Sequence, residues 1–405
     1  MVITGTWQGR PLTISVKRNC LTVSTDDPSQ ADVFSYDLEG RMWTAFIDGI
    51  AYRRGLDGKM VARWRNPGEE RNRRWLPQDE AVSIEARAHR HIQHLYTAIQ
   101  QGEAELRTPL SPQGHQVFRQ ILAFDPAHSM ADAARYYDVY KPVGILPPDQ
   151  YMAVVLQMTE GCSFNTCNFC TFYKDRPFRI KSPDEFRQHA IAVRDFLGAG
   201  LSLRRTIFLG DANAMVVPMR TLLPLLDVVH EVYDVDKLGG MYAFLDGFSG
   251  EKKPAADYQR LYDKGIKTVY IGLESGHAPL LKFLKKPGTP REAIKAVRAI
   301  KAGGIAVGII ILLGAGGQQH ADSHVRDTIK ALNAMDLDMD DIIYFSEILV
   351  GEDTPYAREA YQAGLQPLSH SERLAQGAAI EAGLHFSSEG GVPKISRYDI
   401  REFVY

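Results

Sequence analysis

The stretch that decides the fold of this 405-residue chain reads Ile305-Ala306-Val307-Gly308-Ile309-Ile310-Ile311-Leu312-Leu313. A strand with one wet face alternates apolar and polar residues, whereas a strand of a parallel sheet is covered on both sides and reads as a continuous apolar run. The run is far too short to span a bilayer. It therefore predicts a strand in a parallel sheet that is covered by helices.

Strand and helix patterns alternate on both sides of this run. The predicted strands cover 151–158, 205–210, 239–245, 267–273, 305–313 and 341–349, and predicted helices include 183–199, 254–264 and 291–302. Six such repeats favour an α/β fold with a partial (β/α)6 TIM-like barrel over 146–365, although periodicity alone does not separate it from an open Rossmann sheet. In both folds the chemistry lies at the carboxyl ends of the strands.

The flanking regions have different patterns. Residues 1–80 contain short strand patterns and the turn pairs Asp48-Gly49 and Asp57-Gly58, which predict a small antiparallel β-rich domain. Apolar residues at helical spacing predict a helical linker over 81–145. We expect 366–405 to form a C-terminal helix and an aromatic, charged tail that covers a barrel opening.

The overall composition is that of an ordinary soluble protein. A net charge of -2, 45% hydrophobic residues and 24% charged residues give no global attraction to nucleic acid or membranes. The first residues lack the basic start and apolar core of a signal peptide. We therefore expect a cytoplasmic protein with no membrane partner.

Three of the four cysteines, Cys162, Cys167 and Cys170, lie within nine residues, in the loop after the first predicted barrel strand. Thiolates are soft ligands that select iron–sulfur clusters or zinc. Three thiolates can bind three irons of a 4Fe–4S cluster and leave the fourth iron open. Zinc remains the alternative, but no histidine lies near Cys170 in sequence to complete a zinc site. Cys20 stands apart and is expected to pack as a small hydrophobe.

From these motifs, residues 150–365 resemble the radical S-adenosylmethionine (SAM) superfamily, with one residue more than its usual C-x3-C-x2-C spacing. The other segments that resemble the superfamily contain Asp211, Glu274 and Ile310, and each lies at the carboxyl end of a predicted strand. The resemblance implies that Phe169 meets the adenine, that Gly210 and Asp211 lie at the SAM amino group, that Glu274 and Ser275 contact the ribose, and that Ile310 lines the adenine pocket.

The resemblance also implies an activity and its partners. A 4Fe–4S cluster and SAM would be the cofactors, and the 5′-deoxyadenosyl radical from SAM would take hydrogen from a small or medium organic substrate. Flavodoxin or ferredoxin would supply the electron. The reaction would be that of an oxidoreductase, a transferase or a lyase.

Two acidic residues are candidates for the substrate site. Asp246 ends the predicted strand 239–245, and Glu347 lies next to Ser346 on the sixth strand. Neighbouring strand residues face opposite ways, so only one of Ser346 and Glu347 can point into the barrel. A charge inside a barrel is costly unless it is paired or used.

Two alternative functions remain open from the sequence. One is a haem chaperone similar to relatives of oxygen-independent coproporphyrinogen oxidase. The other is RNA modification by a basic region that contains Trp64, Trp75 and the residues Arg53, Arg54, Lys59, Arg63, Arg65, Arg71, Arg73 and Arg74, against Asp57, Glu69 and Glu70. A basic surface or docking face is the plainer interpretation of that region.

Two patterns imitate ligand sites. Asp322 to Asp327 partly matches a cobalamin-binding string, but it falls at a predicted helix start and lacks the final glycine. His89, His91 and His94 are expected to occupy a solvated helix face.

Overall fold

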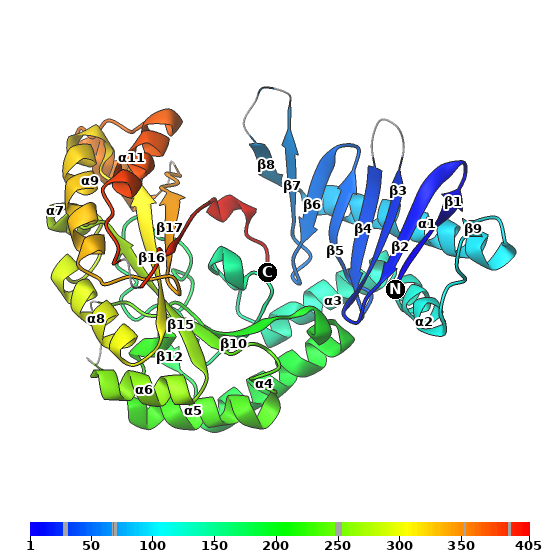
Figure 1. The fold of residues 1–405 in the computed structure, drawn as a ribbon, viewed down its shortest axis with the longest axis horizontal. Coiled ribbons are helices and arrows are strands. Elements are labelled where there is room, and N and C mark those ends of the chain that lie inside the picture. The colour runs from blue at the N-terminus through cyan, green and yellow to red at the C-terminus, as the bar shows by residue number, and fades with distance from the viewer. Residues whose placement is uncertain (27–30, 67, 69–70, 248–252, 352–353, 388–389) are drawn as a thin grey trace. The chain divides into compact units, whose positions relative to one another are not determined.

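The computed structural model describes residues 1–26, 31–66, 68, 71–247, 253–351, 354–387 and 390–405. The chain forms two compact units. Unit 1 comprises Met1–Val154, Ile191–Arg205 and Arg401–Tyr405, and unit 2 comprises Val155–Ala190 and Thr206–Ile400 (Figure 1).

Unit 1 is built on a nine-stranded sheet in the order β8-β7-β6-β5-β4-β3-β2-β1-β9, with antiparallel neighbours. Its strands are β1 (Val2–Trp7), β2 (Arg10–Val16), β3 (Cys20–Asp26), β4 (Ala31–Asp37), β5 (Met42–Ile47), β6 (Ile50–Arg54), β7 (Met60–Arg65), β8 (Arg71–Trp75) and β9 (Glu105–Leu106). The pair Asp48-Gly49 joins β5 to β6 with φ values of 52° and 77°, which are the positive values that a tight hairpin requires. The predicted antiparallel β-rich region is thus confirmed.

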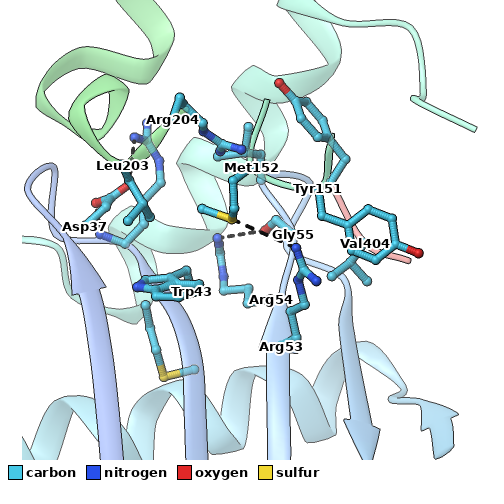
Figure 2. A pocket seen from close by; sticks show the side chains of 14 residues that line it. Asp37, Trp43, Arg53, Arg54, Gly55, Tyr151, Met152, Leu203, Arg204 and Val404 are labelled. Atoms are coloured by element: carbon cyan, nitrogen blue, oxygen red, sulfur yellow. Dashed lines mark hydrogen bonds and ion pairs between the residues drawn. The ribbon is translucent and has the colours of Figure 1, made fainter. Parts of the chain in front are cut away.

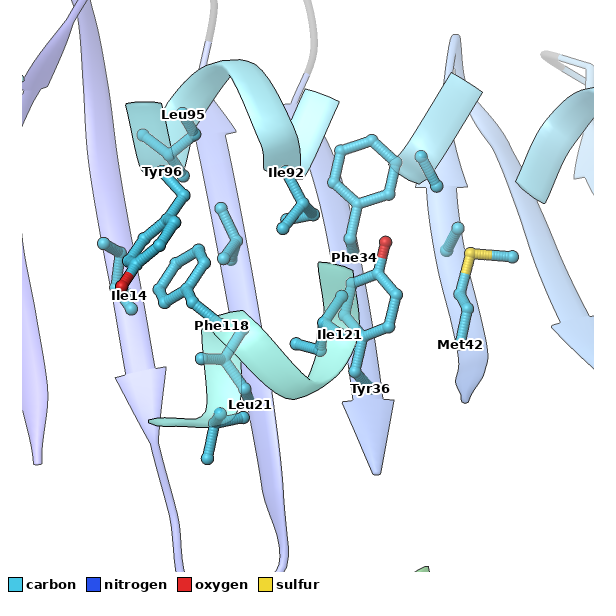
Figure 3. Packing of buried hydrophobic residues seen from close by; sticks show 14 of the residues in the cluster. Ile14, Leu21, Phe34, Tyr36, Met42, Ile92, Leu95, Tyr96, Phe118 and Ile121 are labelled. Carbon is cyan, nitrogen blue, oxygen red and sulfur yellow. The ribbon is translucent and has the colours of Figure 1, made fainter. Parts of the chain in front are cut away.

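The two faces of this sheet differ in chemistry. One face carries residues such as Ile14, Phe34 and Tyr36, which pack against buried side chains of the helices α1 (Gln78–Gln101) and α2 (Pro112–Ala123). Figure 3 shows this core, with Phe118 of α2 among the strand residues. The other face carries small polar residues, including the bonded cross-strand pair Thr22 and Ser35. Residues 81–145, predicted as a helical linker, thus supply much of the core of unit 1.

A small cavity of about 30 Å³ lies in unit 1 among arginine and aromatic side chains (Figure 2). Arg54 is paired there with Glu85 at 2.8 Å, and Arg53 lies over the ring of Tyr151. The last residues of the chain also belong to this region, because the Leu56 amide donates to the carbonyl oxygen of Tyr405 at 2.7 Å. The third helix of this region is α3 (Pro126–Val139).

Unit 2 is built on a parallel sheet in the order β10-β13-β14-β15-β16-β17-β18. Its strands are β10 (Ala153–Gln157), β13 (Thr206–Gly210), β14 (Met241–Phe244), β15 (Ile266–Glu274), β16 (Ala306–Leu313), β17 (Ile342–Glu347) and β18 (Lys394–Tyr398). The helix α4 (Pro183–Leu197) begins in unit 2 and continues into unit 1. The helices within unit 2 are α5 (Met219–Val232), α6 (Ala255–Asp263), α7 (Ala278–Phe283), α8 (Pro290–Ala302), α9 (Gly317–Asn333), α10 (Pro355–Gln362) and α11 (His370–Ala382). In the described part of the chain, no helix combines the length and apolar character that a membrane crossing requires.

The strand order separates the two folds that the sequence left open. Each strand of the sheet neighbours the next one along the chain, so the order never reverses. Crossovers between parallel strands are right-handed, and an unreversed order therefore places the connecting helices on one face. A Rossmann sheet reverses and carries helices on both faces. The singly wound arrangement of a partial barrel is therefore confirmed.

The seventh strand, β18, was not predicted. It pairs in parallel with β17 in the register Ile342↔Lys394 to Ser346↔Tyr398. The segment 366–405 was expected to end as a tail over the barrel, whereas the structure adds its strand to the sheet and assigns Arg401–Tyr405 to unit 1. The helix expected in this segment is present as α11.

Register assigns the faces of the parallel sheet. An added Cβ on Gly247 would contact both Ile271 and Ala293 of α8, and one on Gly377 of α11 would contact Leu313. Ile271 and Leu313 therefore point toward the helices. The opposite, interior face carries a group of aromatic rings. Phe208 contacts Phe244 with ring centroids 5.1 Å apart, and Tyr270 packs against both. Tyr270 also lies so close to Gly308 that an added Cβ would be 2.3 Å from its ring, so only glycine fits there.

Candidate functional site

The cysteine loop begins directly after β10. The short strands β11 (Thr159–Glu160) and β12 (Arg179–Ile180) pair in antiparallel fashion and close the loop at its base. All three cysteines are half-buried within it. Gly161 starts the loop with φ 76°, and an added Cβ would lie 2.8 Å from the Pro177 carbonyl oxygen. The loop therefore lies at the carboxyl end of the first strand, as the sequence predicted.

Asp211, directly after β13, forms hydrogen bonds that hold this loop in place. Its carboxylate accepts hydrogen bonds from the Gly161 amide at 2.9 Å, the Gln157 side chain at 2.7 Å and Arg176 Nε at 3.1 Å. Asp211 is 3% exposed, and burial raises its pKa while Arg176 opposes that shift. The sequence-based assignment of Asp211 to the SAM amino group stays a prediction. The contacts that the structure shows are those of a residue that positions the loop.

Asn168 holds the middle of the loop, between the second and third cysteines. Its backbone amide donates to the Leu284 carbonyl oxygen at 3.1 Å, and its side chain donates to Phe283 O and to Glu359, both at 2.9 Å. The neighbouring Phe169 packs against an apolar cluster formed by Leu280, Leu284, Leu312, Ala315, Ile348 and Tyr356. These contacts fix the positions of Cys167 and Cys170 relative to the ends of α7 and β16.

Asn213 joins the start of the loop to β14. Its Nδ2 donates to Ser163 Oγ at 2.7 Å, and its Oδ1 accepts from the backbone amide of Asp246 at 2.7 Å. Asn213 is 1% exposed. The sequence analysis missed this residue, although it lies only two positions after Asp211. Asp246, a predicted substrate-site residue, is thereby held beside the cysteine loop.

A buried ion pair lies at the end of β15. The register of β15 shifts between Gly272 and Glu274, and Glu274 has φ 60°, so the strand bulges there. The Glu274 carboxylate folds over Gly272, where an added Cβ would lie 2.3 Å from its Oε1. It pairs with Lys286 Nζ at 3.3 Å. Gly272 therefore leaves the space that the carboxylate occupies.

Lys286 connects this ion pair to the cysteines and was missed by the sequence analysis. Burial disfavours its charge, but Glu274, Asp246 and Cys167 raise its pKa, so the ammonium form is retained. Burial raises the pKa of Cys167 to about 12; the Lys286 charge opposes this shift, and the other two cysteines add to it. The pKa of Cys170 is also raised by burial. Lys286 therefore brings a positive charge within electrostatic reach of Cys167 and Cys170.

Ser275 is completely buried. Its Oγ is 2.6 Å from His324 Nδ1 and accepts a hydrogen bond from the His277 amide at 3.0 Å. Burial lowers the pKa of His324 to about 4. The ribose contact of Ser275 stays a prediction, and its side chain is bonded within the protein. His324, part of the string that imitates a cobalamin motif, is equally buried.

Glu347 lies on the helix side of the sheet. It shares a face with Leu313 by register, and its carboxylate contacts Arg373 Nε at 2.6 Å and His370 Nδ1 at 3.0 Å, both from α11. Ser346 lies on the interior face and is 3% exposed. Of the two alternatives, the structure thus places Ser346 inward, which disfavours Glu347 as a substrate residue.

The remaining predicted residues occupy interior or edge positions. Ile310 pairs in register with Gly272 on the interior face and is half-buried, unlike its fully buried neighbours Ile309 and Ile311. The Gly210 carbonyl oxygen accepts from Thr159 Oγ1 at 3.0 Å, which adds a second tie between β13 and the start of the loop.

The described residues contain no group of three or more His, Cys, Asp or Glu side chains gathered as ligands of a metal ion. The thiolates of a cubane cluster bind three different irons rather than one. The cysteine loop fits such a cluster by its chemistry, since it offers three soft thiols next to a retained positive charge.

The basic region and the histidines His89, His91 and His94 lie in unit 1. Arg63 and Arg73 both pair with Glu402, at 3.0 and 3.2 Å, while Glu69 and Glu70 lie outside the described residues. His91 was expected on a solvated face, but it packs between Trp7 and Phe34, and burial lowers its pKa to about 4. Cys20 is 6% exposed in the core, as expected.

No protein-family model matches this chain, and no curated protein matches it. Solved structures do resemble it. The cobalamin-dependent S-adenosylmethionine radical enzyme OxsB matches with a TM-score of 0.38 and 17% identity, over 57% of this chain and 31% of OxsB. Coproporphyrinogen III oxidase HemN from Escherichia coli, described as a radical SAM enzyme, matches with a TM-score of 0.42 and 12% identity, over 62% of this chain and 53% of HemN.

Streptococcus suis SuiB bound to S-adenosylmethionine matches with a TM-score of 0.41 and 11% identity, over 87% of this chain and 72% of SuiB. The chain thus spans about a third of the length of OxsB and about half of that of HemN. At such low TM-scores, function has to be argued from the residues of this chain.

Proposed function

We propose that this chain is a radical SAM enzyme in which Cys162, Cys167 and Cys170 hold a 4Fe–4S cluster. The observation that carries the proposal is the cysteine loop itself. It presents three thiols within nine residues, and Asp211 and Asn168 fix it at the carboxyl edge of a singly wound parallel sheet. Three protein thiolates leave one iron open for a chelating small molecule.

A bound and reduced cluster would supply the electron that cleaves SAM, and the resulting radical would take hydrogen from an organic substrate. The residues of this chain divide the remaining tasks. The proposed nucleoside contacts are Ile310, on the interior face, and the Glu274 carboxylate, which lies over Gly272 on the same face; Asp211 and Ser275 would position the elements that carry these contacts. The backbone of Phe169 is the proposed adenine contact. Asp246 remains the proposed substrate residue.

Lys286 has a proposed electrostatic role at the cysteine loop. Its ammonium group offsets the negative charge that thiolates bring to this partly buried loop. Phe169 of the same loop packs on the apolar cluster, and a less polar surrounding would strengthen that interaction. Glu274 keeps Lys286 charged and in place.

The test is anaerobic reconstitution with iron and sulfide, followed by dithionite and SAM and by chromatography for 5′-deoxyadenosine. We expect the intact chain and Cys20→Ser to release it, and the Ser variants of Cys162, Cys167 and Cys170 to release none. Lys286→Met should lower the yield about tenfold or more, which corresponds to about 1.4 kcal/mol. Lys282→Met, which changes an exposed lysine of α7, is the matched control.

Two results would contradict the proposal. Product release equal to that of free iron and sulfide would show that the loop holds no active cluster. Purified protein that contains zinc and no iron would show a different metal site. The organic substrate and the electron donor, expected to be flavodoxin or ferredoxin, are the next targets once SAM cleavage is established.

A further inference from the structure

The nine-stranded sheet of unit 1 ends differently at its two edges. At one edge β9 is only two residues long, and a very short edge strand gives a foreign strand little to pair with. At the other edge β8 is five residues long and has β7 as its one strand neighbour among the described residues. The β8 edge is therefore the one that offers a full strand for pairing.

The hydrogen-bond pattern shows which residues face outward from β8. The Leu76 amide donates to the Met60 carbonyl oxygen at 2.8 Å, so the directly opposite residues Met60 and Leu76 form a bonded pair. Bonded and non-bonded pairs alternate in an antiparallel ladder. The backbone groups of Arg71, Arg73 and Trp75 thus point away from β7. The Arg73 guanidinium lies 3.3 Å from the Arg71 carbonyl oxygen at this outer edge.

The side chains of these same residues lie on one face and concentrate positive charge there. Arg73 is directly opposite Arg63, and Arg71 is directly opposite Arg65. Like charges in such pairs destabilise a sheet. Burial lowers the pKa of the neighbouring Arg53 to about 10, and Arg63 adds to that shift. Four arginines at adjacent positions therefore concentrate positive charge on this face of β7 and β8.

Glu402 shows what such a pair binds. One of its carboxylate oxygens is 3.0 Å from Arg63, and the other is 3.2 Å from Arg73, so the pair shares one acidic side chain. Arg71, one repeat further along β8, is exposed. Its guanidinium group fits a second carboxylate at the next position on the same face.

The opposite face of the same strands is hollow and largely apolar. A cavity of about 300 Å³ lies between β6, β7, β8 and the start of α1, and it reaches the lower size range of ligand pockets. Tyr52, Trp64 and Ile84 are among its lining residues, and the Arg74–Glu80 ion pair and Ser83 lie around it.

We propose that β8 is a docking edge for an extended peptide in which acidic side chains alternate with apolar ones. Residues opposite Arg71, Arg73 and Trp75 would lie on the arginine face, where the exposed Arg71 would bind a carboxylate, and the residues between them would face the cavity, because strand side chains alternate between faces. Main-chain hydrogen bonds would give affinity, and the two faces would give the sequence preference. This inference concerns unit 1 and does not depend on a cluster.

Two other uses of this edge make different predictions. Charged side chains on an edge strand also prevent association between sheets, and loss of that function would appear as aggregation. RNA would be held by phosphate contacts without a need for alternating apolar groups, and its binding would fall steeply with salt. The cavity beside the arginine pairs favours a peptide, since phosphate recognition makes no use of it.

The test uses the full chain and three fluorescein-labelled probes in anisotropy titrations. The probes are a short peptide with alternating leucine and glutamate, a block peptide of the same composition and an oligouridylate. We expect the alternating peptide to bind about tenfold or more tightly than the other two. Arg71→Glu and the cavity-filling Ser83→Trp should each weaken its binding about tenfold, and Arg90→Glu, an exposed change on α1, should not.

Size-exclusion chromatography of each variant accompanies the titrations. Equal binding of the alternating and block peptides, tighter binding of oligouridylate, or no binding of the alternating peptide would overturn the proposal. Aggregation of Arg71→Glu together with unchanged peptide binding by Ser83→Trp would show that the arginines only protect the edge.

Discussion

The two sheets of this protein use their residues in opposite ways. In unit 1, neighbouring residues of a strand belong to different environments, such as the polar-face Thr13 and the core residue Ile14 of β2. In unit 2, neighbouring residues of β16, such as Ile311 and Leu312, are both buried. A sheet that is covered on both faces leaves little free surface along its strands. Its proposed functional residues therefore lie mainly at the strand ends, whereas unit 1 keeps a whole polar face and an edge.

The largest expected effect concerns the end of the parallel sheet. Asp211→Ala removes the buried acceptor of the Gly161 amide and of the Gln157 side chain, and it breaks the buried pair with Arg176, which keeps its pair with the exposed Asp175; we expect these losses together to cost about 3–5 kcal/mol. We expect unit 2 to lose about that much stability and the reconstituted chain to lose most of its iron. Denaturant unfolding and iron analysis measure these two effects.

Asp175→Ala is the matched control for that variant. Asp175 also pairs with Arg176, at 3.1 Å, but its side chain is 56% exposed. We expect little change in stability or iron content. If both variants lost iron equally, the loop would not depend on the Asp211 contacts.

Alanine changes in adjacent pairs test the contrast between the sheets directly. In β2 we expect Ile14→Ala to cost about 2–5 kcal/mol and Thr13→Ala to cost about 0.5 kcal/mol or less. In β16 we expect Ile311→Ala and Leu312→Ala to cost about 2–5 kcal/mol each. Hydrogen exchange resolved by segment assigns each loss to its unit. An alternating pattern in β16 would show that one of its faces is not packed.

A pH titration probes the packing beneath the end of β15. The pKa of His324 is about 4 in the folded chain, against an ordinary value of 6.5, so the unfolded state binds more protons between these values. The stability of unit 2 should be complete above pH 6.5 and fall by about 3 kcal/mol as the pH drops to 4.

His324→Gln should remove this part of the pH dependence, and His230→Gln, which changes an exposed histidine of α5, should retain it. The slope of the unfolding free energy between pH 4 and 6.5 is the quantity to compare. An unchanged slope in His324→Gln would place the responsible proton elsewhere.

A smaller effect is expected at the bulge of β15. In Gly272→Ala the added methyl group would lie 2.3 Å from the Glu274 carboxylate, which must then move away from Lys286. We expect a loss of about 1–3 kcal/mol and weaker SAM binding by equilibrium dialysis. Gly351→Ala, whose added methyl group makes an ordinary 3.5 Å contact, is the control. Equal SAM binding by the two variants would remove Glu274 from the proposed nucleoside site.

Much of unit 2 was predictable because its strands carry a strong local pattern. The six predicted strands correspond to β10 and β13 to β17, and the loop with Cys162 was placed at the end of the first. The seventh strand, Lys394–Tyr398, escaped prediction because it mixes charged and aromatic residues and has no continuous apolar run. Its membership in the sheet depends on pairing with β17, which is a long-range contact.

Site residues could be predicted only where they belong to a recognisable sequence motif. The cysteines stand out by their spacing, whereas Lys286 lies in an unremarkable Lys-Lys-Pro-Gly stretch and becomes notable only beside Glu274. The paired state of Asp211 also depends on Arg176, which is 35 residues away in sequence. For Ser346 and Glu347, alternation predicted that they face opposite ways, and only the sheet register decided which one faces inward.

The central claim is that three thiolates hold a cluster whose fourth iron is open to SAM. The most direct test is electron paramagnetic resonance of the reduced, reconstituted chain with and without SAM, together with metal analysis of the same sample. We predict the signal of a reduced 4Fe–4S cluster that changes when SAM is added, in the wild type and in Cys20→Ser alike. A signal that SAM leaves unchanged, or a sample that holds zinc in place of iron, would contradict the claim.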